Sequence, residues 1–332
     1  MEHTPPYLGA AYYPEDWPLE QIDDDIALMK QAGLNCVRVA EFAWSTMEPR
    51  EGEYDFAWLH TVLDKLGDAR ISVVMCTPTA TPPAWLTSKH PDTLYVYEDG
   101  TKTTHGARRH YDPCSKVYRE YTERIVTRMA QEFGQDERIV GWQIDNELFP
   151  SGTWSFAPSF SPECHAAFAE FMRKRFGTID KLNEAWCASL WSQTYDSFEQ
   201  IPFPDSRVWH HPALRTAWRE FVEQAYLEYL DFQADLLHKY VTQPIGTNMM
   251  IVAGLDFWKA NRKLDVVQFD RYNYGDSLWH VPFWLDIMRP IKERPFWVME
   301  TSTCWSGSAE SDVYSERGFC TANSWLSIAL GG

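Results

Sequence analysis

The sequence of 332 residues lacks the features that mark membrane, secreted and nucleic-acid-binding proteins. No apolar run approaches the ~20 residues that a membrane-spanning helix needs. The N-terminal segment, MEHTPPYLGAAYY, contains no basic stretch followed by an apolar one, so no secretory signal is expected. With 30 Lys+Arg against 47 Asp+Glu, the formal net charge of −17 argues against nucleic acid or an anionic membrane surface as the partner. We therefore expect a cytoplasmic protein.

Cysteine is sparse: the 7 cysteines are scattered, odd in number, and form no Cys-x-x-Cys pair. This pattern favours reduced thiols over disulfides or a metal cluster. Internal repeats and low-complexity linkers are also absent, and 332 residues can bury a sizeable core as one large domain. We expect one catalytic domain over residues 1–332.

Aromatic residues, in contrast, are abundant: 16 Trp, 16 Tyr and 18 Phe make up 15% of the chain. A large core accounts for many of them. Trp44, Trp85, Trp154 and Trp305 lie in stretches rich in Gly, Pro and Ser, where packing alone explains them less well. Because indole rings stack on the C–H faces of sugars, core packing and carbohydrate contact both remain open for this surplus.

The apolar pattern alternates between strand and helix periodicity along the whole chain, which is typical of a mostly parallel sheet, closed or open. Strands are expected over residues 8–12, 35–39, 71–76, 139–144, 244–250, 266–269 and 296–299. Helices are expected from Pro18 to Gly33 and over about residues 56–66, 115–134, 161–177, 213–241 and 315–330, with an irregular stretch at about 185–212. Seven strands are visible, and no eighth.

Two glutamates, Glu147 and Glu300, each follow a short apolar run, in IVGWQIDNEL and RPFWVMET. Parallel barrels place their chemistry at the C-terminal ends of the strands. Two carboxylates facing one cavity there can cleave a glycosidic bond, one as a protonated acid and the other as an ionised nucleophile. Either glutamate alone could equally be a solvated residue at a strand end, but the pair favours a glycoside hydrolase.

The sequence also resembles glycoside hydrolase family 42, the β-galactosidases built on a (β/α)8 TIM barrel. The matching stretches are GAAYYPEDWP (9–18), VRVAEFAWSTMEP (37–49), TPTATPPAWL (77–86), GARRHYDP (106–113), QIDNE (143–147) and FWVMET (296–301). They occur in family order over nearly the whole chain. The resemblance implies a barrel that lacks its eighth strand and retains the rest.

The resemblance also implies roles for individual residues. Glu147 would be the acid/base and Glu300 the nucleophile of a double displacement that retains anomeric configuration. Galactose contacts would come from Arg108, Asn146, Tyr272 and Trp305. No metal or organic cofactor is expected for this chemistry.

Two departures from the family pattern are visible. Many members hold a zinc with four cysteines, whereas Asp112 occupies the first of these positions here and only Cys164 remains of the other three. Cys114 lies two positions from the expected site, so we predict no structural zinc. The chain also ends where an eighth strand, a trimerisation domain and a small β domain would follow, which suggests a fragment of a longer protein.

We expect hydrolysis of terminal non-reducing β-D-galactose from β-galactosides or galacto-oligosaccharides. The resemblance implies a homo-oligomer, a trimer in the full-length family, but the sequence leaves the oligomeric state of this chain open. The alternatives are an α-L-arabinopyranosidase or another barrel glycosidase, and a truncated, non-catalytic sugar-binding protein. Arabinopyranose is galactose without C6 and its hydroxyl, and a pocket discriminates against such a loss by only ~1–3 kcal/mol.

Overall fold

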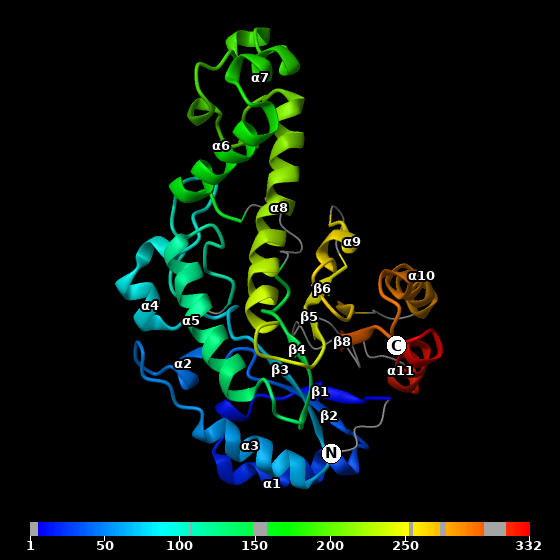
Figure 1. Cartoon of the computed structure of the whole chain (residues 1–332). Coiled ribbons are helices and arrows are strands. Elements are labelled where there is room, and N and C mark those ends of the chain that lie inside the picture. Colours follow the sequence, from blue (N-terminus) through cyan, green and yellow to red (C-terminus); the bar gives the residue numbers. More distant parts are fainter. Residues whose placement is uncertain (1–5, 107, 149–157, 252–254, 273–276, 302–316) are drawn as a thin grey trace.

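The computed structural model describes residues 6–106, 108–148, 158–251, 255–272, 277–301 and 317–332 (Figure 1). Its centre is a set of parallel strands that follow one another in sequence order, as in a (β/α)8 barrel. The strands are β1 (Gly9–Ala11), β2 (Cys36–Val39), β3 (Ser72–Cys76), β4 (Ile139–Gln143), β5 (Ile245–Gly246), β6 (Asn248–Met250), β7 (Gln268–Arg271) and β8 (Trp297–Thr301).

All seven predicted strands are present, and the predicted fifth strand is divided into β5 and β6 by Thr247. The Thr247 hydroxyl donates a hydrogen bond to the Ile144 carbonyl oxygen at 2.7 Å, beyond the end of β4. As a result, β5 completes a ladder of β1 to β5, whereas β6 starts a second ladder with β7 and β8. The division lies at the level of the candidate site.

The outer strands β1 and β8 each pair on one side only within the described ranges. The three residues of β1 are exposed, and four of the five residues of β8 are half-buried. The Tyr7 ring meets the Trp297 ring edge-on with 6.4 Å between centroids, so the two ends of the strand series approach each other. Residues 302–316 lie outside the described ranges, and the missing eighth strand therefore stays a prediction.

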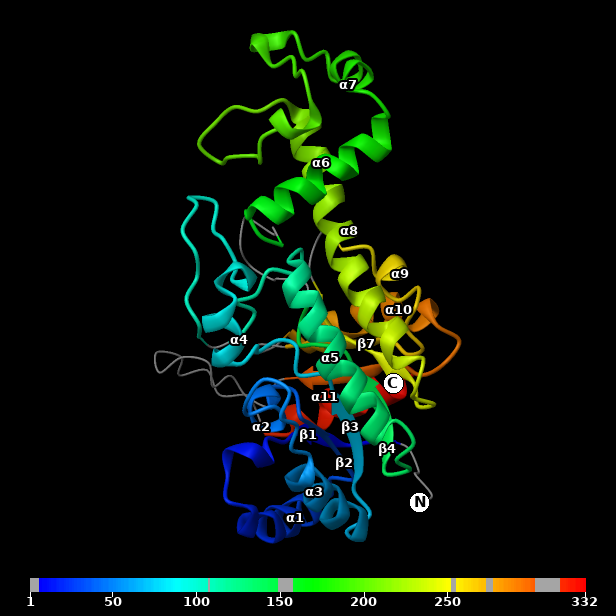
Figure 2. The same ribbon diagram turned by 60° about the vertical axis from the view of Figure 1, so that its left-hand side comes forward.

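Helices cover the outside of the strands. They are α1 (Ile22–Gln31), α2 (Trp44–Met47), α3 (Ala57–Asp68), α4 (Ala84–Lys89), α5 (Lys116–Phe133), α6 (Pro162–Phe176), α7 (Ile179–Trp186), α8 (Pro212–Leu237), α9 (Phe257–Ala260), α10 (Val281–Met288) and α11 (Phe319–Ala329). Helix α5 packs along α8, and α6, α7 and the first half of α8 project from the barrel as a separate lobe (Figures 1 and 2).

Several helix predictions need correction. The helix expected from Pro18 begins only at Ile22, as α1, because Leu19–Gln21 form a 3-10 turn in which Leu19 is 37% exposed. Helix α7 was not predicted, although Thr178 caps it through the backbone N–H of Lys181. Helix α10 was not predicted either. Its residues, VPFWLDIM, are apolar except for Asp286, and periodicity cannot separate helix from strand in so short an apolar run.

Inside the barrel, the large Trp297 side chain of β8 packs against Gly141 of β4. A Cβ on Gly141 of β4 would lie 2.5 Å from the end of the Trp297 ring of β8, so this position has room only for glycine. The contact joins two strands that belong to different ladders. It also brings together the two strands whose ends carry Glu147 and Glu300.

Candidate active site

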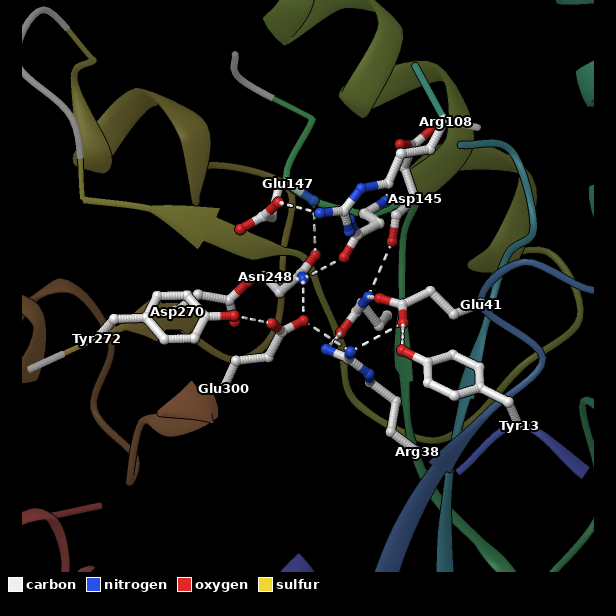
Figure 3. A network of polar contacts seen from close by, with 12 residues as sticks. Tyr13, Arg38, Glu41, Arg108, Asp145, Glu147, Asn248, Asp270, Tyr272 and Glu300 are labelled. Atoms are coloured by element: carbon white, nitrogen blue, oxygen red, sulfur yellow. Dashed lines mark hydrogen bonds and ion pairs between the residues drawn. The ribbon is translucent and has the colours of Figure 1, made fainter. Parts of the chain in front are cut away.

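Glu147 and Glu300 meet at the C-terminal ends of the strands, as the sequence predicted. Glu147 follows β4 by four residues, and Glu300 lies within the last residues of β8. Asp270, near the end of β7, is the register partner of Glu300. Carboxylate oxygens from these three residues lie within 4.8 Å of one another (Figure 3). This separation leaves room for direct attack on a sugar but not for an intervening water.

The turn between β4 and Glu147 has an unusual backbone conformation. Asp145 and Glu147 have φ values of 53° and 46°, in the left-handed region that residues with a side chain rarely adopt. Hydrogen bonds from the hydroxyls of Thr79 (2.6 Å) and Tyr111 (3.0 Å) hold the Asp145 carboxylate in place. Such strain persists only where the surroundings fix it, and it is concentrated at functional sites.

The Glu147 carboxyl is suited to act as an acid. The residue is only 7% exposed, and burial raises the pKa of its carboxyl. The nearby cations oppose this rise, with Arg109 Nη1 at 3.8 Å and Arg108 Nη2 at 3.9 Å from Oε2, while the negative charge of Glu300 adds to it. The net effect is a raised pKa, which favours a protonated carboxyl.

The pKa of the Glu300 carboxyl, in contrast, is lowered. Burial alone would raise its pKa, but the Arg38 guanidinium and a hydrogen bond from the Tyr272 hydroxyl outweigh burial and lower it. Arg38 Nη2 lies 2.7 Å from Glu300 Oε1. Glu300 is therefore held ionised, as a nucleophile requires.

A buried ion-pair network supports Glu300. Arg38, on β2, also bonds Glu41 Oε2 at 2.8 Å and Gln143 Oε1 at 3.2 Å. Glu41 in turn accepts a hydrogen bond from the Tyr13 hydroxyl at 2.8 Å. The Arg38 and Glu41 side chains are 5% and 1% exposed, so this network is shielded from water.

No role was predicted from the sequence for Arg38, Glu41, Asn248 or Asp270. The structure brings all four into the site. A signal was present for two of them: Arg38 and Asp270 are charged residues within short strands that are otherwise buried. Such a charge needs a partner, since its burial without one is costly. Asn248 and Glu41 carry no comparable signal.

Three of the four residues predicted to contact the sugar, Arg108, Asn146 and Tyr272, lie in or beside the site. Asn146 Oδ1 accepts a hydrogen bond from Asn248 Nδ2 at 2.8 Å, and the other end of the Asn146 amide lies 3.0 Å from Arg108 Nη1. Tyr272 points at Glu300 (Figure 3). Trp305 lies outside the described residues, so its placement stays a prediction.

At the position where many family members bind zinc, Asp112 forms hydrogen bonds with other groups of the protein. Asp112 is fully buried and accepts hydrogen bonds from the Ser161 hydroxyl and, at 2.7 Å, from the backbone N–H of Cys114. Burial raises the pKa of Asp112 to about 6. Within the described ranges, the one cluster with metal-binding geometry is that of Glu147, Asp270 and Glu300. Arg38 and Tyr272 already bond both oxygens of Glu300.

No helix in the described part of the chain combines the length and the apolar character needed to cross a membrane.

A parallel barrel with paired carboxylates at its strand ends defines the class of barrel glycoside hydrolases. A family model described as beta-galactosidase, that of glycoside hydrolase family 42, matches residues 11–332. The chain belongs to this family, and the predicted resemblance is confirmed.

Known proteins extend this match. The chain is 39% identical to the beta-galactosidase YesZ of Bacillus licheniformis over 329 residues, covering 98% of this chain and 49% of that protein. It superimposes on the beta-galactosidase structure from Halorubrum lacusprofundi with a TM-score of 0.90 and 35% identity, covering 98% of this chain and 51% of the other. The structure from Marinomonas ef1 gives a TM-score of 0.89 and 31% identity, covering 97% of this chain and 52% of the other. The chain thus spans about half the length of the relatives it matches.

Proposed function

We propose that the chain hydrolyses terminal non-reducing β-D-galactose residues of β-galactosides by double displacement, with residues 1–332 as its catalytic domain. One observation carries the mechanism: two carboxyls with opposite pKa shifts, Glu147 raised and Glu300 lowered, have oxygens within 4.8 Å of each other. Retaining glycosidases hold their carboxyls ~5–5.5 Å apart, whereas inverting enzymes need ~6.5–9.5 Å. The preference for galactose rests on the names of the relatives.

In the first step, a Glu300 oxygen attacks the anomeric carbon while Glu147 donates its proton to the leaving oxygen. This gives a glycosyl ester on Glu300 and releases the alcohol. Esterification removes the negative charge of Glu300, which is one of the causes that raise the pKa of Glu147. The Glu147 pKa therefore falls once the ester has formed. Glu147 can then take a proton from the water that hydrolyses the ester.

Arg108, Asn146, Tyr272 and Trp305 are proposed as contacts to the galactose hydroxyls and ring. Arg108 and Asn146 lie beside Glu147, and Tyr272 lies beside Glu300. Homo-oligomerisation and a cytoplasmic location remain proposals. The six described cysteines are all free, which fits a reducing compartment.

The test is release of p-nitrophenol from p-nitrophenyl β-D-galactoside by the parent chain and by Glu300→Gly, with and without azide. We expect loss of activity in the variant and rescue by azide with formation of α-galactosyl azide, because azide attacks from the face that Glu300 has vacated. For Glu147→Ala, with a 2,4-dinitrophenyl galactoside whose leaving group needs no proton, azide should give β-galactosyl azide. Glu53→Gly, at an exposed surface glutamate, is the matched control. A folded parent chain without turnover would show that the proposed activity is wrong for this polypeptide.

A further inference from the structure

Asn248 occupies the point where the fifth barrel strand is divided. It is the first residue of β6, one position after Thr247, and its side chain is fully buried. Its register partner on β7 is Gln268. The division of the strand places this amide among the ends of β4, β7 and β8 rather than within a continuous ladder.

The two ends of the Asn248 amide contact different parts of the catalytic machinery (Figure 3). Its Oδ1 accepts a hydrogen bond from the backbone N–H of Glu147 at 2.9 Å. Its Nδ2 donates to Asn146 Oδ1 and to Asp270 Oδ2, both at 2.8 Å, and lies 3.4 Å from Glu300 Oε1. One side chain therefore connects the backbone of the acid/base to the carboxylate of the nucleophile.

We propose that Asn248 is a positioning residue that sets the spacing between Glu147 and Glu300 and helps to keep Glu300 ionised. The inference rests on the proposed glycosidase function and deepens it. Asn248 acts through the two glutamates, and neither bond formation nor proton transfer takes place on the amide itself.

The contact with Glu147 fixes the backbone of the acid/base. Glu147 has a φ of 46°, a strained conformation that persists only where the surroundings enforce it. A buried N–H without a partner would add to the cost of this strain. Since the Asn248 oxygen satisfies this N–H, it stabilises the turn that aims the Glu147 carboxyl into the site.

The contact with Glu300 is electrostatic. The amide N–H groups present partial positive charge to Glu300 and Asp270, both of which lie among other carboxylates. Asp270 is buried, and burial together with the charge of Glu300 raises its pKa well above its ordinary value. Arg38 and the Tyr272 hydroxyl stabilise the Glu300 charge, and the Asn248 amide adds partial positive charge beside the same carboxylate. The charged and titratable groups that face Glu300 from the surrounding elements are Arg38, Glu41, Cys76, Arg108, Glu147, Asp270 and Tyr272.

Two substitutions separate the two contacts. Asn248→Asp keeps an oxygen for the Glu147 N–H but replaces the donor near Glu300 with a carboxyl oxygen. Asn248→Ala removes both contacts. The control is Asn183→Ala, because Asn183 makes a comparable pair of backbone hydrogen bonds, to Tyr195, in the projecting lobe. Circular dichroism and thermal unfolding establish that each variant is folded, and Asn248→Asp, which is nearly isosteric, serves if Asn248→Ala does not fold.

The first readout is the pH dependence of kcat/KM, whose acid limb reports Glu300. A like charge within ~4–6 Å raises the pKa of a carboxyl by about 1–3 units. We expect the acid limb of Asn248→Asp to move to higher pH by about one unit or more. The second readout is the ratio of kcat/KM for phenyl and 2,4-dinitrophenyl galactosides, because only the former needs a proton from Glu147. Asn248→Ala should lower this ratio about 10- to 100-fold through misplacement of the acid.

A measurement without turnover distinguishes failure of this inference from failure of the proposed function. In protein labelled with carboxyl-13C glutamate, the NMR titration of Glu300, assigned by its loss in Glu300→Gln, reports the pKa directly. A higher pKa in Asn248→Asp than in the parent supports the inference whether or not the chain is active. Folded Asn248 variants with the parent's Glu300 pKa, acid limb and substrate ratio would overturn it. A loss of activity that leaves all three unchanged would mean a merely structural role.

Discussion

Replacement of Arg38 by methionine tests whether this cation, rather than the solvent, keeps the nucleophile ionised. Arg38 Nη2 lies 2.7 Å from Glu300 Oε1, and the Arg38 side chain is 5% exposed, so solvent screens the pair little. An opposite charge at this range lowers a carboxyl pKa by about 1–3 units. Its removal should raise the Glu300 pKa by that amount, which corresponds to about 1.4–4 kcal/mol.

The same substitution should destabilise the fold for a separate reason. Glu41 is 1% exposed and would lose its cation. Removal of one partner of a buried ion pair costs about 3–5 kcal/mol. The double variant Arg38→Met/Glu41→Gln removes the stranded charge and should recover much of the free energy of unfolding, while the Glu300 pKa stays raised. The double variant therefore separates the effect of Arg38 on the free energy of unfolding from its effect on the Glu300 pKa.

The assay is kcat/KM for p-nitrophenyl β-D-galactoside against pH, together with urea unfolding. The folded-state pKa of Glu300 lies below its ordinary value, so ionised Glu300 adds stability at neutral pH that is lost as pH falls through the folded-state pKa. In Arg38→Met the acid limb should shift to higher pH, and the stability that ionised Glu300 adds at neutral pH should decrease. Arg50→Met, at an exposed arginine, is the control. An acid limb of folded Arg38→Met within 0.3 units (roughly the error of such profiles) of the parent would refute this assignment to Arg38.

Three further predictions concern stability and metal content. Burial raises the pKa of the Glu15 carboxyl to about 7, so its contribution to stability is fully present below the ordinary pKa of a glutamate and is lost as pH rises through about 7. From about pH 4 to about pH 8, the free energy of unfolding in urea should therefore fall by about 3 kcal/mol less in Glu15→Gln than in the parent. Equal falls in the two proteins would contradict this prediction. Gly141→Ala should cost about 1–3 kcal/mol because its Cβ meets the Trp297 ring, whereas Gly106→Ala, whose Cβ has a nearest neighbour at 3.8 Å, should cost less. The protein should contain no stoichiometric zinc by mass spectrometry of metals, and a chelator should leave its melting temperature unchanged; a lowered melting temperature would show that Asp112 and the cysteines bind metal after all.

The sequence predicted the elements that have a strong local signal. The seven strands are short apolar runs bounded by turn residues; Glu147 lies four residues after β4, and Glu300 lies near the end of β8. The predicted helix starts at Ser115 and Ser161 are confirmed, since both side chains cap their helices by accepting backbone hydrogen bonds, from Tyr118 and Cys164. Local chemistry decides all of these features.

The missed residues depend on contacts between distant segments. Arg38 reaches Glu300 across 262 positions, and Asn248 reaches the Glu147 backbone across 101. Neither partner can be identified without the strand register. Helix α7 was missed for a related reason: its short apolar face becomes decisive only through packing against α6.

Strand irregularities explain how both glutamates come to face the same cavity. Register shifts occur in the β3–β4 pairing between Val73 and Val74, and in the β7–β8 pairing between Phe269 and Asp270. Each shift adds one residue to the strand that carries a catalytic glutamate. Strict alternation along β8 would place Glu300 on the face opposite Trp297, whose ring fills the barrel interior. The extra residue re-aims Glu300 toward the centre, beside Asp270. Because a shift of one residue turns every later side chain to the other face, the irregularity in β8 is as necessary to the site as the glutamate itself.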